Sequence, residues 1–124
     1  RDVERSRGLG DVYKRQLIDS AKDYVHRNYR SVDLGLDDTC KELGVSNSYF
    51  SSLFKKETGS SFVEYLTDYR MDKAARMLVE TDDKSYVIAQ NVGYADPNYF
   101  SYVFKRKYGV SPSRYRTEYE KNKV

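Results

Sequence analysis

The 124-residue sequence has few of the residue types that build disulfides, metal sites and covalent catalytic centres. It contains one cysteine, Cys40, one histidine, His26, and no tryptophan. A single cysteine excludes an internal disulfide and fits a reducing, cytoplasmic compartment. A zinc site needs several converging cysteine, histidine or carboxylate ligands, so we expect no metal and no other cofactor. Because the chain also has no phosphate-cradling glycine loop and no catalytic triad, we do not expect an enzyme.

Long hydrophobic runs and a strong net charge are absent too. No apolar stretch approaches the ~20 residues of a membrane-spanning helix, and no signal-peptide pattern appears, so we expect no membrane association in this fragment. The formal net charge is only +3, but basic residues dominate the C-terminal third. They are Lys105, Arg106, Lys107, Arg114, Arg116, Lys121 and Lys123, against Glu118 and Glu120. On charge alone a solvated helical face is the commoner explanation, and a phosphate-facing surface is the other.

Two prolines and seven glycines punctuate the sequence, and between them apolar residues recur at three- and four-residue steps, as in amphipathic helices. No stretch alternates cleanly enough for a strand, so the predicted fold is all-α. We expect about seven helices, over residues 17–29, 36–43, 47–57, 61–79, 85–92 and 97–108, with the last beginning at Ser111-Pro112. The helix over residues 47–57 should bury Tyr49, Phe50, Leu53 and Phe54.

A repeat of about 50 residues runs through the chain. The first copy contains Cys40-Lys41-Glu42-Leu43-Gly44, Tyr49-Phe50-Ser51, Phe54-Lys55-Lys56, Gly59, Ser61 and Tyr65. The second contains Ala89-Gln90-Asn91-Val92-Gly93, Tyr99-Phe100-Ser101, Phe104-Lys105-Arg106, Gly109, Ser111 and Tyr115. Two such copies fit either a duplicated DNA-reading unit or a protein-binding scaffold. A helical-repeat scaffold usually needs three or more repeats, which favours the first interpretation.

The spacing within each copy is typical of a helix-turn-helix. This motif needs a small residue where its two helices touch and a glycine where the chain reverses. Ala89 and Gly93 supply them in the second copy, and Cys40 and Gly44 supply them in the first. Cys40 is therefore better explained as a small buried hydrophobic residue than as a reactive thiol. For His26, beside the apolar face of its helix, a packing or surface role is favoured over a role as a ligand.

The second helix of each unit would enter the DNA major groove with its N-terminal part, so outward side chains there are candidates for base contacts. They are Asn47, Ser48, Ser51 and Ser52 in the first unit, and Pro97, Asn98, Ser101 and Tyr102 in the second. Asparagine can bond the adenine edge in a bidentate manner, serine is a short donor and acceptor, and proline can touch a thymine methyl group. Plain solvated surface is the alternative, and position rather than residue type favours base contact.

Basic side chains on the same helices and just after them are candidates for phosphate contacts, which hold the register of binding but carry little sequence information. They are Lys55, Lys56, Lys105, Arg106, Lys107, Arg114 and Arg116. For Arg116, pairing with Glu118 or Glu120 is an equally good alternative.

The expected organisation is a first helix-turn-helix subdomain at residues 17–60, a linker helix at 61–80 and a second subdomain at 81–124. A linker of about 19 residues would be roughly 28 Å long, against ~34 Å for one turn of DNA. One chain could then place two recognition helices in successive major grooves, over an asymmetric site of roughly two turns whose bending compensates for the shorter linker.

Several motifs occur together in this order. The second unit contains Ile88-Ala89, Val92-Gly93-Tyr94, Asp96, Tyr99-Phe100, Phe104-Lys105, Gly109, Ser111-Pro112 and Tyr115-Arg116. The first unit contains Leu43-Gly44-Val45-Ser46, Tyr49-Phe50, Leu53-Phe54-Lys55-Lys56 and Gly59, and the linker contains Phe62, Tyr65, Arg70 and Lys73-Ala74. Over about residues 17–119 this pattern resembles the AraC/XylS family of transcription regulators, and it is most similar to output domains of YesN-like two-component response regulators.

The resemblance implies a bacterial, bihelical domain that binds specific double-stranded DNA to regulate transcription and that often contacts RNA polymerase. It also implies a longer regulator whose N-terminal receiver or sensor domain lies outside this chain. Where the family has an arginine near the outer face of each recognition helix, this chain has Ser52 and Tyr102, so readout would rest on Asn47, Asn98, serine contacts and DNA shape. The alternative function is a helical protein-interaction scaffold without DNA specificity.

Residues 1–16 match nothing in the family pattern. This segment is polar, basic and glycine-bearing, as in Arg5-Ser6-Arg7-Gly8-Leu9-Gly10. We expect a tag, an artefact or a linker remnant that is poorly ordered unless it extends the first helix.

Overall fold

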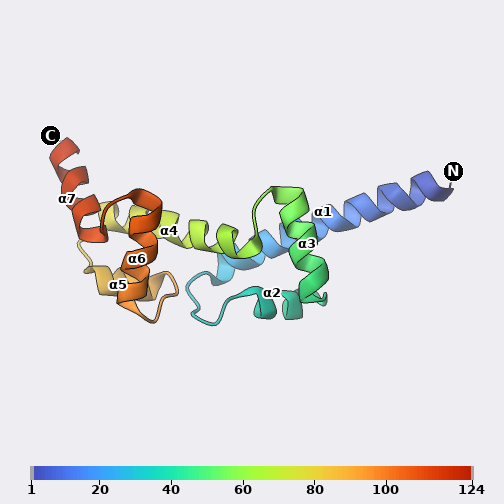
Figure 1. The fold of residues 1–124 in the computed structure, drawn as a ribbon, viewed down its shortest axis with the longest axis horizontal. Coiled ribbons are helices and arrows are strands. Elements are labelled where there is room, and N and C mark those ends of the chain that lie inside the picture. Colours follow the sequence, from blue (N-terminus) through green and yellow to red (C-terminus); the bar gives the residue numbers. More distant parts are fainter. Residues whose placement is uncertain (1, 124) are drawn as a thin grey trace. The chain divides into compact units, whose positions relative to one another are not determined.

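A computed structural model describes the backbone of residues 2–123 and the side chains of residues 10–122. Within these ranges every regular element is an α-helix, which confirms the all-α prediction (Figure 1). The helices of this described part are α1 (Asp2–Asn28), α2 (Leu36–Leu43), α3 (Asn47–Thr58), α4 (Phe62–Glu80), α5 (Ser85–Asn91), α6 (Pro97–Tyr108) and α7 (Pro112–Lys123).

The limits of α2 to α6 and the start of α7 agree with the expected ones to within one residue, and local caps set several of them. A serine or aspartate before a helix can accept a backbone N–H that the first turn leaves without a partner. The side-chain oxygens of Ser46, Ser61, Asp96 and Ser111 each accept such an N–H, from Tyr49, Glu64, Asn98 and Arg114 respectively. At the other end, Gly44, Gly59 and Gly109 have the positive φ that ends a helix.

Helix α1 differs from the expectation, since it begins at Asp2 rather than at residue 17. The segment 1–16 is therefore not a loose leader over Asp2–Gln16: there it extends the first helix. Val12 and Tyr13 in this extension are about half exposed, at 49% and 53%. At Val12 and Tyr13 the helix is therefore extended by propagation, in which each added residue gains one backbone hydrogen bond, and not by burial of these two side chains.

The chain divides into two compact units, each made of two stretches of sequence. Unit 1 comprises Arg1–Asn28 and Gly35–Tyr65, and unit 2 comprises Tyr29–Leu34 and Leu66–Val124. The boundary falls inside α4, so the expected linker helix is shared between the units and is not a separate domain.

The core of unit 1 is formed by the buried face of α1 and a cluster of phenylalanines. Along α1 the buried side chains recur at the three- and four-residue steps seen in the sequence: Leu17, Ile18, Ala21 and Val25. Helix α1 contacts both α2 and α3. The rings of Phe50, Phe54 and Phe62 pack on one another with centroids 5.5–5.6 Å apart, so they hold α3 against the start of α4.

The core of unit 2 is also built from buried apolar and aromatic side chains of its helices. It includes one further residue from the segment between α1 and α2. Its buried members are Tyr29, Met71, Ala74, Ala75, Leu78, Ile88, Ala89, Val92, Tyr94, Phe100 and Phe104. Tyr29 enters from that segment, and its ring meets Tyr69 edge-on at 5.3 Å between centroids. The second unit thus depends on a short stretch of chain that comes before most of the first unit in the sequence.

Candidate nucleic-acid interface

Each unit contains two helices joined by a tight turn at a glycine. In unit 1 the turn follows α2 at Gly44, whose φ is +71°, and the N–H of Val45 bonds the carbonyl of Cys40 at 3.1 Å. In unit 2 it follows α5 at Gly93, whose φ is +93°, and the N–H of Tyr94 bonds the carbonyl of Ala89 at 2.9 Å. A left-handed glycine followed by a capped second helix is the expected arrangement of a helix-turn-helix, and it occurs twice.

The small residues of both turns are buried where the two helices meet. Cys40 is 1% exposed and Ala89 is fully buried. Burial raises the pKa of the Cys40 thiol, and the nearby Asp37 carboxylate raises it further, so the reactive thiolate is disfavoured. This supports the interpretation of Cys40 as a small hydrophobic residue. His26 lies at the exposed surface with its Nε2 atom 2.8 Å from the hydroxyl of Tyr65.

The base-contact candidates of unit 1 lie at the start of α3. Asn47, Ser48 and Ser52 are exposed and Ser51 is half-buried. The amide of Asn47 donates a hydrogen bond to Asp37 at the start of α2. Asn47 therefore already joins the two helices, and a contact to DNA would compete with this bond.

In unit 2, Pro97, Asn98 and Tyr102 are exposed along α6 and Ser101 is half-buried. Tyr102 points away from the core with 57% of its surface exposed, and its hydroxyl accepts a 3.4 Å hydrogen bond from Arg106 one turn later. This contact places the Arg106 guanidinium beside the Tyr102 ring on the surface of α6.

Tyr49 is a correction to the sequence prediction, because its side chain is 44% exposed and not part of the buried side of α3. Its counterpart Tyr99, which we did not propose as a site residue, is 55% exposed. Their neighbours Phe50 and Phe100 are fully buried. The repeat aligns the two tyrosines at the same place before these phenylalanines, and this alignment was the signal that could have identified Tyr99.

Four of the phosphate-contact candidates, Lys55, Lys56, Lys105 and Arg106, are exposed on the last turns of α3 and α6. Arg114 is also exposed, and its guanidinium pairs with Glu118 at 3.1 Å. An exposed ion pair of this kind contributes little stability, so Arg114 can exchange its partner for a phosphate at small cost.

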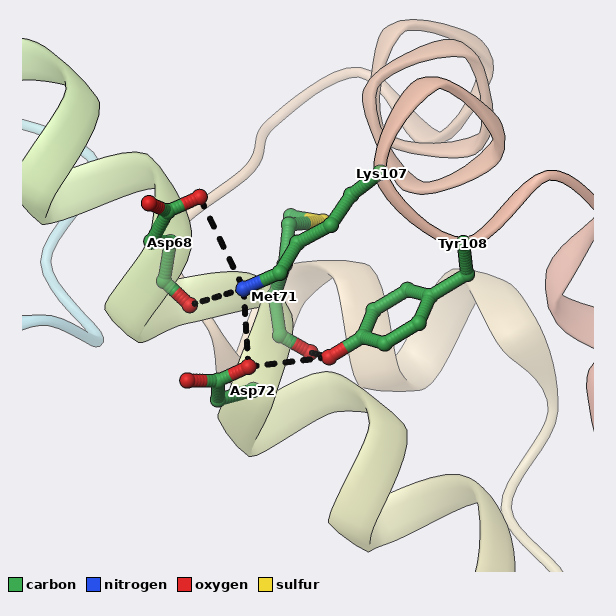
Figure 2. Close-up of polar contacts among 5 residues, drawn as sticks. All are labelled: Asp68, Met71, Asp72, Lys107 and Tyr108. Atoms are coloured by element: carbon green, nitrogen blue, oxygen red, sulfur yellow. Dashed lines mark hydrogen bonds and ion pairs between the residues drawn. The ribbon is translucent and has the colours of Figure 1, made fainter.

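The ammonium of Lys107 contacts acceptors on α4 of the same unit at the exposed surface, and the phosphate contact expected of it stays a prediction (Figure 2). Its Nζ lies 2.8 Å from Oδ1 of Asp72, 3.6 Å from Oδ1 of Asp68 and 3.2 Å from the carbonyl of Asp68. The hydroxyl of Tyr108 donates to the same Asp72 oxygen at 2.9 Å. These bonds tie the end of α6 to α4, so Lys107 positions the recognition helix.

The protonation of this cluster follows from its contacts. Burial alone would raise the pKa of Asp72, but the hydrogen bonds from Lys107 and Tyr108 outweigh it and lower the pKa overall. Burial and the bond to the Asp72 carboxylate raise the pKa of the Tyr108 hydroxyl. At neutral pH the cluster therefore contains a charged Asp72 carboxylate and a neutral Tyr108 phenol.

Arg116 is also engaged within unit 2, and it pairs with neither Glu118 nor Glu120. Its guanidinium donates to the carbonyls of Leu78, Thr81 and Asp83, at 2.8, 3.0 and 2.7 Å. These carbonyls lie at the end of α4 and in the loop after it, where a helix leaves acceptors without partners. The alternative ion pair with Glu118 or Glu120 is therefore wrong, because the guanidinium caps the end of α4 instead, and the phosphate contact of Arg116 stays a prediction.

Among the described residues, no helix combines the length and the hydrophobicity that a membrane span requires. The same part of the chain contains no group of three or more histidine, cysteine or acidic side chains placed to hold a metal ion.

The fold and the two turns define a class, the proteins with paired helix-turn-helix units, and comparison with known proteins names the family. A family profile described as "Helix-turn-helix domain" matches residues 39–118. The chain is 36% identical over 80 residues to the lactose operon transcription activator of Staphylococcus xylosus. The aligned residues cover 64% of this chain and 28% of that protein.

Two solved structures are similar in both sequence and fold. The C-terminal domain of the two-component response regulator YesN from Fusobacterium nucleatum subsp. nucleatum is 36% identical with a TM-score of 0.76, and covers 77% of this chain and 93% of that one. The C-terminal domain of AraT, a response regulator from Geobacillus stearothermophilus, is 39% identical with a TM-score of 0.81, and covers 82% and 84%. The chain therefore belongs to the AraC-type helix-turn-helix family, a family of DNA-binding transcription regulators.

The chain spans 12–32% of the length of the first curated relatives that it matches.

Proposed function

We propose that this chain binds specific double-stranded DNA through α3 and α6, and that it thereby regulates transcription. The proposal rests on an arrangement that occurs twice. Each unit has a buried small residue, a glycine with positive φ and a capped second helix whose polar N-terminal half is exposed. Binding, not catalysis, is the proposed role. Its DNA partner implies action in the cytoplasm of the bacterial cell.

The candidate contacts divide by chemistry. Base contacts come from the exposed side chains at the start of each recognition helix, which are Asn47, Ser48, Ser52, Pro97, Asn98 and Tyr102, with the half-buried Ser51 and Ser101 beside them. Phosphate contacts come from Lys55, Lys56, Lys105, Arg106 and Arg114. Lys107 and Arg116 hold the second unit together, so their loss should weaken binding indirectly, through the position of α6.

The longer relatives suggest the context in which the domain works. Because the chain spans 28% of the lactose operon activator and resembles C-terminal domains of two response regulators, we propose that it is the output part of a longer regulator. An N-terminal receiver or sensor domain would then control it. Contact with RNA polymerase is a further proposal that rests on the family resemblance alone.

Selection of binding sites from random duplexes, at stated salt concentrations, tests this proposal. We expect one asymmetric sequence of roughly two helical turns, with two recognition helices in successive major grooves. Affinity should fall steeply with salt, because bound lysine and arginine release counterions from the phosphates. A selected site with only one short half would contradict the two-groove arrangement. Equal and weak binding to every duplex would contradict sequence-specific binding, and salt-insensitive capture of a protein partner would favour a scaffold.

A further inference from the structure

A row of tyrosine rings leads from the core of unit 2 to the exposed surface of α6. It starts at Tyr94, which is 9% exposed, and continues to Tyr99 at 6.0 Å between ring centroids. Tyr99 then stacks on Tyr102, with centroids 6.3 Å apart and planes 28° apart. The two outer rings have more than half of their surface exposed, so the row ends in an aromatic surface on the recognition helix.

Each end of this row is held by an arginine. The buried Arg70 places its guanidinium 5.4 Å from the Tyr94 ring centroid. Arg106 lies 5.8 Å from the Tyr102 ring centroid and donates to the Tyr102 hydroxyl. Cation–ring contacts and offset stacking both favour a fixed ring orientation, so Tyr102 is better ordered than an isolated surface tyrosine would be.

Unit 1 shows that the fold does not require the row. The positions matching Tyr94, Tyr102 and Arg106 in the repeat are Val45, Ser52 and Lys56. Unit 1 forms the same turn and the same capped helix with these residues. Tyr99 has an exposed counterpart in unit 1, Tyr49, but the exposed ring of Tyr102 has none and needs a reason other than folding. Adjoining exposed aromatic side chains such as Tyr99 and Tyr102 are typical of binding surfaces.

We propose that Tyr102 recognises thymine, with its ring against the C5 methyl group in the major groove, and that Tyr99 is a positioning residue that supports this ring. The inference rests on the proposed DNA binding. Thymine offers the one apolar group on the base edges of the major groove, and an apolar side chain is its natural contact. The Tyr102 hydroxyl accepts from Arg106 and keeps its own proton to donate, whereas the ring supplies the apolar surface that a methyl group needs, and Arg106 remains beside it for a phosphate.

The test compares thymine with deoxyuridine, which lacks only the methyl group. Each thymine of the selected duplex is replaced in turn, and the affinity of the wild-type chain is measured. We expect one or two positions at which loss of the methyl weakens binding about fourfold, the value for one buried methyl-sized group. In Tyr102→Ser, which copies the serine of unit 1, the thymine and uridine duplexes should bind equally. Tyr102→Phe should keep the preference, because it keeps the ring.

Tyr86→Ser is the matched control, since Tyr86 is equally exposed, at 54%, but lies on α5. It should leave the preference for thymine unchanged. Specific binding with no effect of any methyl group would overturn the inference and leave the proposed function standing. A preference that persists in Tyr102→Ser would also overturn it, and would assign the methyl contact to another side chain such as Pro97. Failure to select any sequence would overturn both proposals.

Discussion

Gly44 and Gly93 occupy the same place in the two units and have similar positive φ values, +71° and +93°, yet their surroundings differ. A Cβ atom built on Gly44 would have no atom within 4 Å. One built on Gly93 would lie 2.5 Å from the carbonyl oxygen of Tyr29 and 2.8 Å from the guanidinium of Arg70. The first turn is open to solvent and the second is closed over by another part of its own unit.

This difference shows how one repeated motif can be stabilised in two ways. The first unit relies on its phenylalanine cluster and on the bond between Asn47 and Asp37. The second adds Arg70, which is 7% exposed and donates to the carbonyls of Tyr29 and Ser31 at 3.0 and 2.7 Å. Burial lowers the pKa of Arg70, with Tyr94 opposing this, but a guanidinium keeps its charge at all relevant pH values.

The largest expected effect is that of alanine at the two glycines. Gly93→Ala should lower the free energy of unfolding by about 4 kcal/mol, because the strain of a left-handed alanine adds to a clash with backbone that cannot move freely. Gly44→Ala should cost only about 1 kcal/mol, for the backbone strain alone. Chemical denaturation followed by circular dichroism measures both values. Equal costs would contradict the difference between the open and closed turns.

Next in size is the loss of the buried arginine. Arg70→Ala should destabilise unit 2 by about 3 kcal/mol, because two charge-assisted hydrogen bonds disappear, a buried one to Tyr29 and a part-buried one to Ser31. Hydrogen exchange should locate the loss in unit 2 and leave the amides of α2 and α3 protected. Arg76→Ala is the control on the same helix, since Arg76 is exposed and forms only a 4.0 Å pair with Glu80. Comparable destabilisation by both variants would rule out a special role for Arg70.

The helix boundaries were predictable because their signals are local. A capping serine or aspartate and a terminal glycine act within one turn, so Ser46, Asp96 and Gly44 are readable without a structure. The engagement of Lys107 and Arg116 was not predictable in this way. Their partners lie 33–39 residues away along the chain, and only the packing of α4 against α6 and α7 brings them together.

The sequence predicts which base-contact candidates are exposed, but not which of them are already hydrogen-bonded to other side chains. Helical periodicity separates the exposed Asn98 and Tyr102 from the buried Phe100. It does not reveal that Asn47 is bonded to Asp37 on another helix, or that Arg106 folds back onto Tyr102. Each of these depends on side-chain conformations that several neighbours select together.

A third prediction asks whether both units touch phosphates. Lys55→Ala with Lys56→Ala removes two cations from α3, and Lys105→Ala with Arg106→Ala removes two from α6. Each pair should weaken binding about tenfold and reduce the slope of log affinity against log salt by about 2, because two fewer counterions are released. Fluorescence anisotropy over a salt series gives both values. A slope unchanged by one pair would show that its unit does not contact the backbone of the DNA.

The smallest effect is expected at Asp72. Its ion pair with Lys107 in unit 2 has no equivalent among the described residues of unit 1. The pKa of Asp72 is lowered from 3.8, so the stability it contributes is present above that value and is lost as the pH falls through the pKa of the folded state. Asp72→Asn should therefore cost about 0.5 kcal/mol at neutral pH, as for other exposed pairs, and nothing once the wild-type carboxyl is protonated. Thermal melting from pH 7 to pH 2 checks this. A cost that persists in acid would place the effect in packing, not charge.

The segment Tyr29–Leu34 has a consequence for exchanging parts between relatives. It belongs to unit 2 although Gly35–Tyr65 of unit 1 follows it in the chain. A chimera made with a single junction inside α4 would give the second unit a foreign Tyr29 region under its own Gly93 and Arg70. Recombination that preserves both units needs three junctions, after Asn28, Leu34 and Tyr65, because the two units are interleaved along the sequence and are not consecutive modules.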